Sequence, residues 1–162
     1  MGHLKSEGSH GSTHDGGNEE QEQTRFSAKV IDHGLRPKHR ARMDQPDAFG
    51  DVCGWCGEVM EIFLRLAGDR ITEATFGADG CISSMACGDM LTTMVEGLTL
   101  EQAAKITPDV LVAALGGLPY ASVHCSELAI TALKEALDDA ESRKTRTDRL
   151  PIGPARCTIT WR

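Results

Sequence analysis

The chain has 162 residues and a formal net charge of −7, with 40% hydrophobic and 25% charged residues. The length suits one ordinary domain, and the composition is typical of a globular protein rather than a disordered or fibrous one. An acidic chain argues against nucleic acid as the main partner. No stretch approaches the ~20 apolar residues of a membrane span. We therefore expect one globular domain with no nucleic-acid or membrane partner.

Six cysteines are the feature that needs an explanation. A disulfide framework of that size is typical of secreted proteins. The first twenty residues contain no apolar run of the kind that forms a signal peptide. We therefore predict a reducing, cytoplasmic location, and a chemical role for at least some of the thiols.

Composition divides the chain into three parts. Residues 1–24 are rich in Gly, Ser, His, Glu and Gln, with one leucine and no aromatic residue. They cannot bury enough surface to offset the entropy of ordering, so we predict a disordered tail. We predict a folded domain over residues 25–141. Residues 142–162 are predicted to form a basic C-terminal tail.

The first structured elements are a helix and a loop. The pattern over Ser27–His33 predicts a short helix with Val30 and Ile31 facing inward, and Gly34 is placed to end it. Residues 36–50 are rich in Arg, Asp, Gln and Pro, a composition typical of a surface loop.

The middle of the chain changes from strand to helix periodicity. The β-formers of Val59–Leu66 and Ile71–Phe76 flank the turn signal Gly68-Asp69, which predicts an antiparallel hairpin. Spacings of three and four then predict a helix that ends near Gly97. The apolar residues of that helix are Ile82, Met85, Ala86, Met90 and Met94.

Three further helices are predicted towards the C-terminus. Thr99 is a cap-like residue before the first, and Thr107-Pro108 opens the second, which ends at Gly116-Gly117. The last is predicted from about Ser126 to Glu141. A two-stranded hairpin followed by helices indicates the α+β class, with a small antiparallel sheet covered by helices.

Three cysteines lie on predicted connections. Cys56 precedes the first predicted strand, Cys81 precedes the Met-rich helix, and Cys125 precedes the last helix. Helix N-termini favour the thiolate form, and loops commonly carry function. With Glu58 and His124 beside them, they offer a set suited to zinc or an iron–sulfur centre. The alternative is three unreactive small hydrophobes.

These residues resemble the IscU/NifU-type iron–sulfur cluster assembly scaffolds. The resemblance covers about residues 26–140, and the cysteine intervals of 25 and 44 residues are close to those of IscU-type members. Several ordered motifs over a whole domain make the match specific. The segments that carry it are Phe26–His33, Cys56–Met60, Phe76–Cys81, Leu118-Pro119 and Val123–Ala129.

The resemblance implies a SufE/NifU-like fold and a scaffold rather than a classical enzyme. Such scaffolds assemble a [2Fe–2S] cluster from Fe²⁺ and from sulfur supplied by a cysteine desulfurase, and pass it to apo-proteins. By position, Cys56, Cys81, Cys125 and Glu58 would be ligands, His124 an alternative ligand, and Cys125 the persulfide acceptor. Zn²⁺ can occupy this site in isolated members. Whether two chains form a homodimer around a cluster stays open.

The chain departs from the family pattern at three places. Glu58 stands where the family usually has Asp, and Ile82 where it usually has Gly. The chaperone-recognition segment Leu-Pro-Pro-Val-Lys is replaced by Leu118-Pro119-Tyr120-Ala121-Ser122. Because the second Pro and the Lys are lost, the expectation of docking to an Hsp70-type chaperone is weakened.

Three cysteines exceed the family set. Cys53 forms a C-x-x-C with Cys56, a redox or metal pattern, and we hypothesise that Cys53 competes with Glu58 as fourth ligand. A spare loop thiol is the alternative. Cys87 is predicted to pack as a small hydrophobe, and Cys157 receives no role. Two other functions stay open: a C-x-x-C redox or sulfur-transfer protein, and a zinc-stabilised interaction domain.

Overall fold

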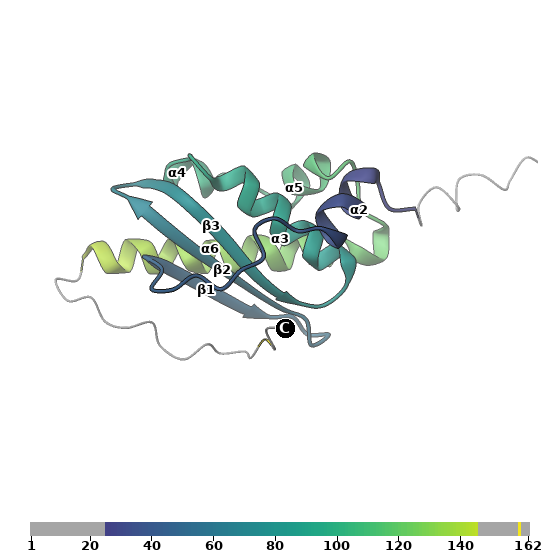
Figure 1. Cartoon of the computed structure of the whole chain (residues 1–162), viewed down its shortest axis with the longest axis horizontal. Coiled ribbons are helices and arrows are strands. Elements are labelled where there is room, and N and C mark those ends of the chain that lie inside the picture. The colour runs from purple at the N-terminus through teal and green to yellow at the C-terminus, as the bar shows by residue number, and fades with distance from the viewer. Residues whose placement is uncertain (1–24, 146–158, 160–162) are drawn as a thin grey trace, which may run out of the picture.

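The computed structural model describes residues 25–145 and Ile159, so the predicted disordered tail and Cys157 lie outside it. Within the described residues, the three strands form one antiparallel sheet in the order β1-β2-β3, and the predicted α+β class is confirmed (Figure 1). The elements are α2 (Ala28–Leu35), β1 (Ala48–Cys53), β2 (Val59–Ala67), β3 (Arg70–Asp79), α3 (Ile82–Val95), α4 (Leu100–Ala103), α5 (Pro108–Ala114), the 3-10 helix η1 (Tyr120–Ser122) and α6 (His124–Lys144).

Strand β1 was not predicted, because its first half, residues 48–50, falls in the segment interpreted as a surface loop and the rest was given no element. It pairs with β2 from Ala48 opposite Leu64 to Cys53 opposite Val59. Gly50 and Asp51 in its middle are poor strand formers, which hid the pattern. An edge strand needs pairing on one side only, so its local signal can be weak.

The predicted hairpin and the helices after it are present. Strands β2 and β3 pair antiparallel on either side of the Gly68-Asp69 turn. Gly97 follows α3 with a φ of +82°, which suits its predicted role as a helix stop. Thr99 and Gln102 form a capping box at α4, and the Thr107 side chain caps α5.

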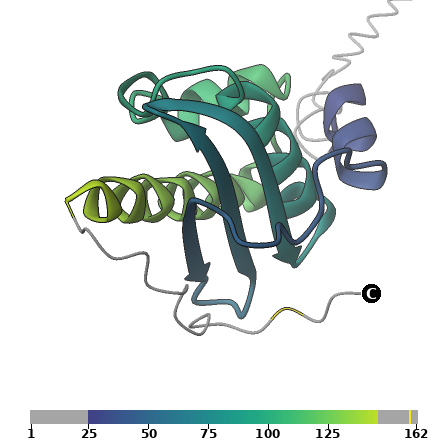
Figure 2. The ribbon, with the colours of Figure 1, turned by 60° about the vertical axis from the view of Figure 1, so that its left-hand side comes forward.

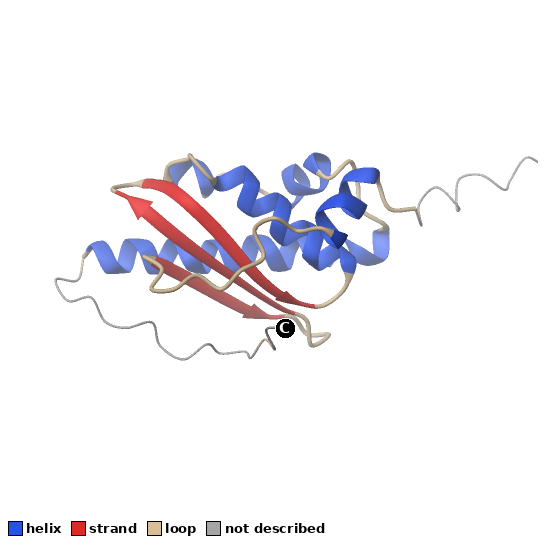
Figure 3. Ribbon diagram, in the orientation of Figure 1, coloured by secondary structure: helices blue, strands red, loops and turns tan. Residues whose placement is uncertain are grey.

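Helices α3 and α6 cover one face of the sheet, as Figures 1 and 3 show. Helix α6 begins two residues earlier than predicted and runs three residues further. A Cβ at Gly50 would collide with the α6 backbone at Ala132 and Ala136, so this glycine lets α6 lie directly on β1. The predicted buried stripe of α6 is confirmed: Leu128, Ala129, Ala132, Leu133, Ala136 and Leu137.

Helix α2 is attached to α3 through one buried carboxylate. Asp89 is 1% exposed and accepts hydrogen bonds from the backbone N–H groups of Lys38 and His39, while its other oxygen lies 2.6 Å from His33 Nδ1. Val30 is buried as predicted, but Ile31 is 43% exposed, so its predicted inward orientation was wrong. The helix also continues through Gly34 to Leu35.

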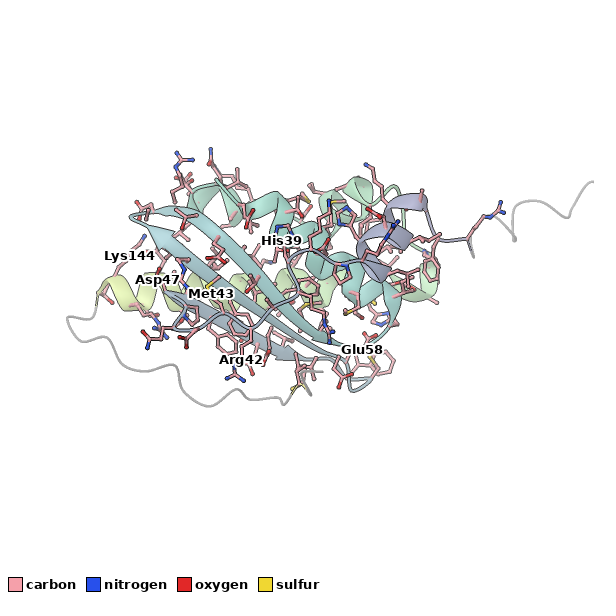
Figure 4. The ribbon with its side chains drawn as sticks, in the orientation of Figure 1. His39, Arg42, Met43, Asp47, Glu58 and Lys144 are labelled. Carbon is pink, nitrogen blue, oxygen red and sulfur yellow. The ribbon has the colours of Figure 1, made fainter. Side chains whose placement is uncertain are left out.

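The segment between α2 and β1 crosses the face of the sheet opposite α6 (Figure 2). Backbone hydrogen bonds join His39 and Ala41 to Phe76 of β3. Figure 4 places Arg42 and Met43 over this face, and Met43 is buried. The sheet is therefore covered on both faces, and its end near Glu58 carries the candidate ligands.

Candidate functional site

Three connections meet at one end of the sheet. They are the β1–β2 turn over Gly54–Glu58, the β3–α3 junction at Gly80-Cys81, and the start of α6 at His124-Cys125. Figure 4 shows Glu58 at this end, beyond the last residues of the strands. Segments far apart in the sequence thus lie together at this end of the sheet.

The β1–β2 turn is held in shape by its own backbone. The Gly54 N–H donates to the Glu58 carbonyl at 2.6 Å, and the Gly57 N–H donates to the Gly54 carbonyl at 3.0 Å. Gly57 has a φ of +87°, a conformation that favours glycine. The turn thereby holds Cys56 and Glu58, with Cys56 exposed and Glu58 partly buried.

The β3–α3 junction places the second cysteine at a helix N-terminus. Cys81 is the N-cap of α3, and its side chain makes no capping hydrogen bond. A Cβ at Gly80 would lie 2.9 Å from Ser84 Oγ and 3.2 Å from Glu58 Oε1. The glycine therefore allows the first turn of α3 to approach the Glu58 carboxylate closely.

The third cysteine lies within the first turn of α6 rather than before it. Cys125 is fully buried, whereas the neighbouring His124 side chain is 37% exposed. His124 Nε2 lies 3.7 Å from Cys125 Sγ and 3.2 Å from Glu58 Oε2. The predicted alternative ligand therefore reaches the same carboxylate as the thiols.

The ligand atoms form two groups that share Glu58. One joins Cys56, Glu58 and His124, the other joins Glu58, Cys81 and Cys125, and within each group all atoms lie within 4.8 Å of one another. Cys81 Sγ and Cys125 Sγ are 3.8 Å apart, and Cys125 Sγ is 3.8 Å from Glu58 Oε2. Metal–sulfur bonds of about 2.3 Å at tetrahedral angles place two sulfurs about 3.8 Å apart. The spacing thus suits a tetrahedral metal centre.

Glu58 is kept ionised at the centre of this arrangement. Burial alone would raise the pKa of its carboxyl group. Hydrogen bonds from Ser84, Cys81 and Cys56, and the charge of His124, together bring that pKa below its ordinary value of 4.5. An ionised carboxylate at neutral pH is the form that can bind a metal ion.

The buried thiols are kept protonated. Burial, together with the nearby charges of Cys81 and Glu58, raises the pKa of Cys125 to about 12, although a hydrogen bond from Ser84 acts in the opposite direction. Burial raises the pKa of Cys87 still further. Cys87 belongs to the hydrophobic core, which confirms the prediction that it packs as a small hydrophobe. Burial thus favours the protonated thiol of Cys125, and a metal ion bound to its sulfur would favour the thiolate.

Cys53 does not join either ligand group. It is disulfide-bonded, whereas Cys56, Cys81, Cys87 and Cys125 are free thiols. The two cysteines of the C-x-x-C are consequently not joined to each other. In this form of the chain, the hypothesis that Cys53 serves as a fourth ligand has no support.

Sequence reasoning missed Ser84. Its hydroxyl donates to Glu58 Oε1 at 3.0 Å and lies 3.5 Å from the sulfurs of both Cys81 and Cys125. Ser84 follows Cys81 by three residues, so the N-cap and the third helical residue share one face. That spacing was the signal available in the sequence.

Comparison with known proteins identifies the family of this chain. The NifU-like N terminal domain matches residues 25–147. The chain is 36% identical over 126 residues to "Iron-sulfur cluster assembly scaffold protein IscU 1" of Archaeoglobus fulgidus, covering 77% of this chain and 82% of that protein. It is 31% identical over 127 residues to the IscU scaffold protein of Aquifex aeolicus, covering 76% and 80%.

A solved structure shares the fold. The N-terminal NifU-like protein of Brucella abortus superposes with a TM-score of 0.61 at 14% identity, over 72% of this chain and 94% of that one. At this identity the likeness concerns the fold alone, and it agrees with the predicted NifU-like architecture. Separately, none of the helices in the described part of the chain has the length and apolar character to cross a membrane.

Proposed function

The chain belongs to the NifU-like N-terminal domain family, and we propose that it is a scaffold on which an iron–sulfur cluster is assembled and from which the cluster passes to apo-proteins. The observation that carries the proposal is that Cys56 in one group, and Cys81 with Cys125 in a second, lie within 4.8 Å of the same Glu58 carboxylate. The cluster is the cargo of this protein rather than a resident cofactor. The role is that of a carrier and not of a classical enzyme.

The proposed ligands are three thiolates and one carboxylate. Cys56, Cys81 and Cys125 would bind iron through sulfur and Glu58 through oxygen, and His124 would replace one of them during exchange. A harder oxygen ligand binds an iron–sulfur cluster less tightly than a fourth thiolate. A [2Fe–2S] cluster held in this way should be released more readily than one held by four cysteines.

Sulfur would arrive as a persulfide on a cysteine desulfurase. The Cys125 thiolate attacks the outer sulfur of that persulfide, the desulfurase cysteine leaves as a thiolate, and Cys125 then carries the sulfur. The burial of Cys125 and the raised pKa of its thiol disfavour the thiolate in the metal-free chain. Fe²⁺ bound to the sulfur would favour the thiolate that this step needs.

The same geometry supports a second function. Zn²⁺ accepts three thiolates and one oxygen or nitrogen ligand in a tetrahedral site, and a permanently bound zinc would make this a zinc-stabilised interaction domain. The solvent exposure of Cys56 and Cys81 favours exchange, because a partner protein can reach these ligands directly. A Cys53–Cys56 redox protein is less favoured, since Cys56 is a free thiol.

The proposed partners are a cysteine desulfurase and apo-proteins that receive the cluster. We place the chain in a reducing compartment such as the cytoplasm, because Cys56 and Cys81 must stay reduced to bind iron. The exposed Tyr120 stands in the segment where the family's chaperone motif has a proline, so an Hsp70-type chaperone is not among the partners we propose.

Anaerobic assembly tests the proposal. The metal-free chain is incubated with Fe²⁺, cysteine and a cysteine desulfurase, and visible absorption is followed. A brown protein with sulfide-to-iron charge-transfer bands supports the scaffold. A colourless chain that keeps one tightly bound Zn²⁺ would instead support the interaction domain. Reductase turnover with a Cys53–Cys56 disulfide would support the redox alternative.

A further inference from the structure

Two of the proposed ligands are thiols that lie against each other. Cys81 Sγ and Cys125 Sγ are 3.8 Å apart, and both residues are free cysteines. A disulfide bond places its two sulfurs about 2.05 Å apart, so a movement of about 1.8 Å would join this thiol pair. The metal-free site therefore contains two sulfurs that can be oxidised together as well as bind a metal ion.

Cys81 is the member of the thiol pair that an oxidant reaches first. Cys81 is exposed to solvent, whereas Cys125 is fully buried. Thiol–disulfide exchange requires the attacking and leaving sulfurs to lie on opposite sides of the sulfur between them. A group attached to Cys81 from solvent points away from the protein interior, where Cys125 lies. The geometry thus suits attack by Cys125 on an oxidised Cys81.

The Cys81 side chain has freedom to turn towards its partner. Cys81 is the N-cap of α3, and its sulfur makes no capping hydrogen bond. Its sulfur lies 3.5 Å from the Ser84 hydroxyl, which is a long and weak contact for a thiol. A change of the Cys81 rotamer therefore breaks no strong hydrogen bond, and the Cys125 helix can stay in place.

The other free cysteines do not offer a comparable pair. Cys56 is also exposed, but its neighbouring ligand atoms belong to Glu58 and His124. Within the described residues, no group of ligand atoms within 4.8 Å of one another contains Cys56 together with Cys81 or Cys125. Cys87 is fully buried within the hydrophobic core. Contact between the sulfurs thus favours oxidation of one particular pair.

We propose that Cys81 and Cys125 form a reversible disulfide when the site holds no metal, and that this disulfide is an oxidised state in which the site cannot bind its cluster. Glutathione disulfide first forms a mixed disulfide with Cys81 and releases one glutathione thiol. Cys125 then attacks the Cys81 sulfur and releases the second glutathione. The thiol pair loses two electrons and two protons, and the oxidant is reduced to two thiols.

The consequence for the site rests on the proposed function. A disulfide and a metal ion compete for the same two sulfurs, so bound metal protects them and oxidation excludes metal. An exposed thiol that oxidises alone proceeds to sulfinic acid, which is irreversible, whereas a neighbouring thiol traps it as a reducible disulfide. Cys81 is exposed, so cellular thiols can restore the pair. The disulfide thereby preserves the ligands of an empty site.

Disulfide mapping tests the pairing without using the cluster. The metal-free full chain is oxidised with glutathione disulfide, remaining thiols are blocked with iodoacetamide, and trypsin digestion follows without reduction. We expect peptide 71–105 linked to peptide 106–134, and no such product from Cys81→Ser. Peptide 71–105 also contains Cys87, so Cys87→Ala is the matched control and should keep the link. A link that ends on Cys56 or Cys87, or no link at all, would overturn the proposal.

The mixed disulfide tests the role of Cys125 as the attacking thiol. In Cys125→Ala no thiol displaces glutathione from Cys81, so the mixed disulfide at Cys81 should accumulate at least about tenfold more than in wild type. Mass spectrometry of the 71–105 peptide measures its amount. Equal amounts of glutathione on Cys81 in the two proteins would contradict attack by Cys125.

Competition with metal is measured with Zn²⁺ alone. At a free Zn²⁺ concentration 100 times its Kd, the link should form about 100-fold more slowly, because only the empty site reacts. The oxidised chain should bind Zn²⁺ at least about 100-fold more weakly than the reduced chain, and dithiothreitol should restore binding. Link formation at the same rate with and without Zn²⁺ would overturn the competition.

The two proposals fail in different ways. If the linked peptides form but the reduced chain binds no Zn²⁺ and assembles no cluster, the scaffold function fails and the disulfide stands. If the reduced chain assembles a cluster but the oxidised chain yields no linked peptides, the disulfide fails and the scaffold function stands.

Discussion

The two ends of the sheet use their polar groups in opposite ways. At the β2–β3 end, polar side chains close the fold: Thr99 caps α4 within a capping box, and Lys144 pairs with Asp69. At the other end, Cys81 takes the N-cap of α3 without capping it. Its sulfur instead faces Cys125 and Glu58. The comparison shows that helix-capping stability is given up where ligand atoms are needed.

The largest expected effect comes from restoring the missing cap. Cys81→Ser supplies a good N-cap, so the metal-free chain should gain about 0.5–1 kcal/mol in free energy of unfolding. The loss of a thiolate should weaken Zn²⁺ binding at least about 100-fold. Urea unfolding and competition with a chromophoric chelator measure the two quantities. As a control, Cys87→Ala should bind Zn²⁺ normally. An unchanged Zn²⁺ affinity in Cys81→Ser would contradict the role of the Cys81 sulfur as a ligand.

Thiol reactivity distinguishes the exposed Cys56 from the buried Cys125. Iodoacetamide at pH 8 should alkylate Cys56 about 100-fold faster than Cys125, because Cys125 is buried with a pKa of about 12. Cys87 should react slowest of the three. A mass-spectrometric time course on metal-free protein measures the order. Similar alkylation rates at Cys56 and Cys125 would show that the Cys125 thiol is accessible to solvent and would contradict its burial.

A smaller loss of Zn²⁺ affinity is expected on substitution of Ser84, and the neighbouring Ser83 provides a matched control. Ser84→Ala removes the hydroxyl that donates to Glu58 and contacts both sulfurs, which should weaken Zn²⁺ binding about tenfold. Ser83 is equally buried, and its hydroxyl makes no hydrogen bond within the described residues. Ser83→Ala should therefore leave Zn²⁺ binding unchanged. Equal losses in the two variants would indicate a packing effect instead.

The smallest expected effect is on the pH dependence of stability. The folded chain lowers the pKa of Glu58, so this residue stabilises the fold above pH 4.5, and that contribution is lost as the pH falls. Burial raises the pKa of Glu61, with Asp51 adding to the shift and Arg42 opposing it. The stability associated with Glu61 is present at low pH and is lost as the pH rises.

Urea unfolding of the metal-free chain between pH 3 and 7 distinguishes the opposite pH dependences expected for Glu58 and Glu61. Relative to wild type, Glu58→Gln should lose less stability on acidification, and Glu61→Gln should lose more. Both variants keep the size of the side chain, which makes each the control for the other. If both variants changed the loss of stability on acidification in the same direction, the pKa values of Glu58 and Glu61 would not be shifted in opposite directions.

The sequence predicted those parts of the molecule that depend on local pattern. The β2–β3 hairpin, the caps at Thr99 and Thr107 and the buried stripe of α6 each follow from short-range periodicity or capping chemistry. Strand β1 could not be predicted in this way, because it forms through pairing with β2 although Gly50 and Asp51 are poor strand formers. Ile31 was misplaced because a short helix offers too few residues to define its buried face.

The residues of the candidate site could be named from the sequence, but the groups that position them could not. The cysteines, Glu58 and His124 could be named from motif and spacing, and the structure brings them together. The hydroxyl of Ser84 and the close approach at Gly80 depend on how α3 meets the β1–β2 turn.

Cluster transfer tests the central claim most directly. A chain loaded anaerobically with its cluster is mixed with an apo-ferredoxin, and circular dichroism follows the cluster in both proteins. The account predicts that the scaffold signal falls as the ferredoxin signal rises, with matching stoichiometry and a rate faster than cluster loss to chelator alone. A cluster that stays on the chain while the apo-ferredoxin remains empty would contradict it.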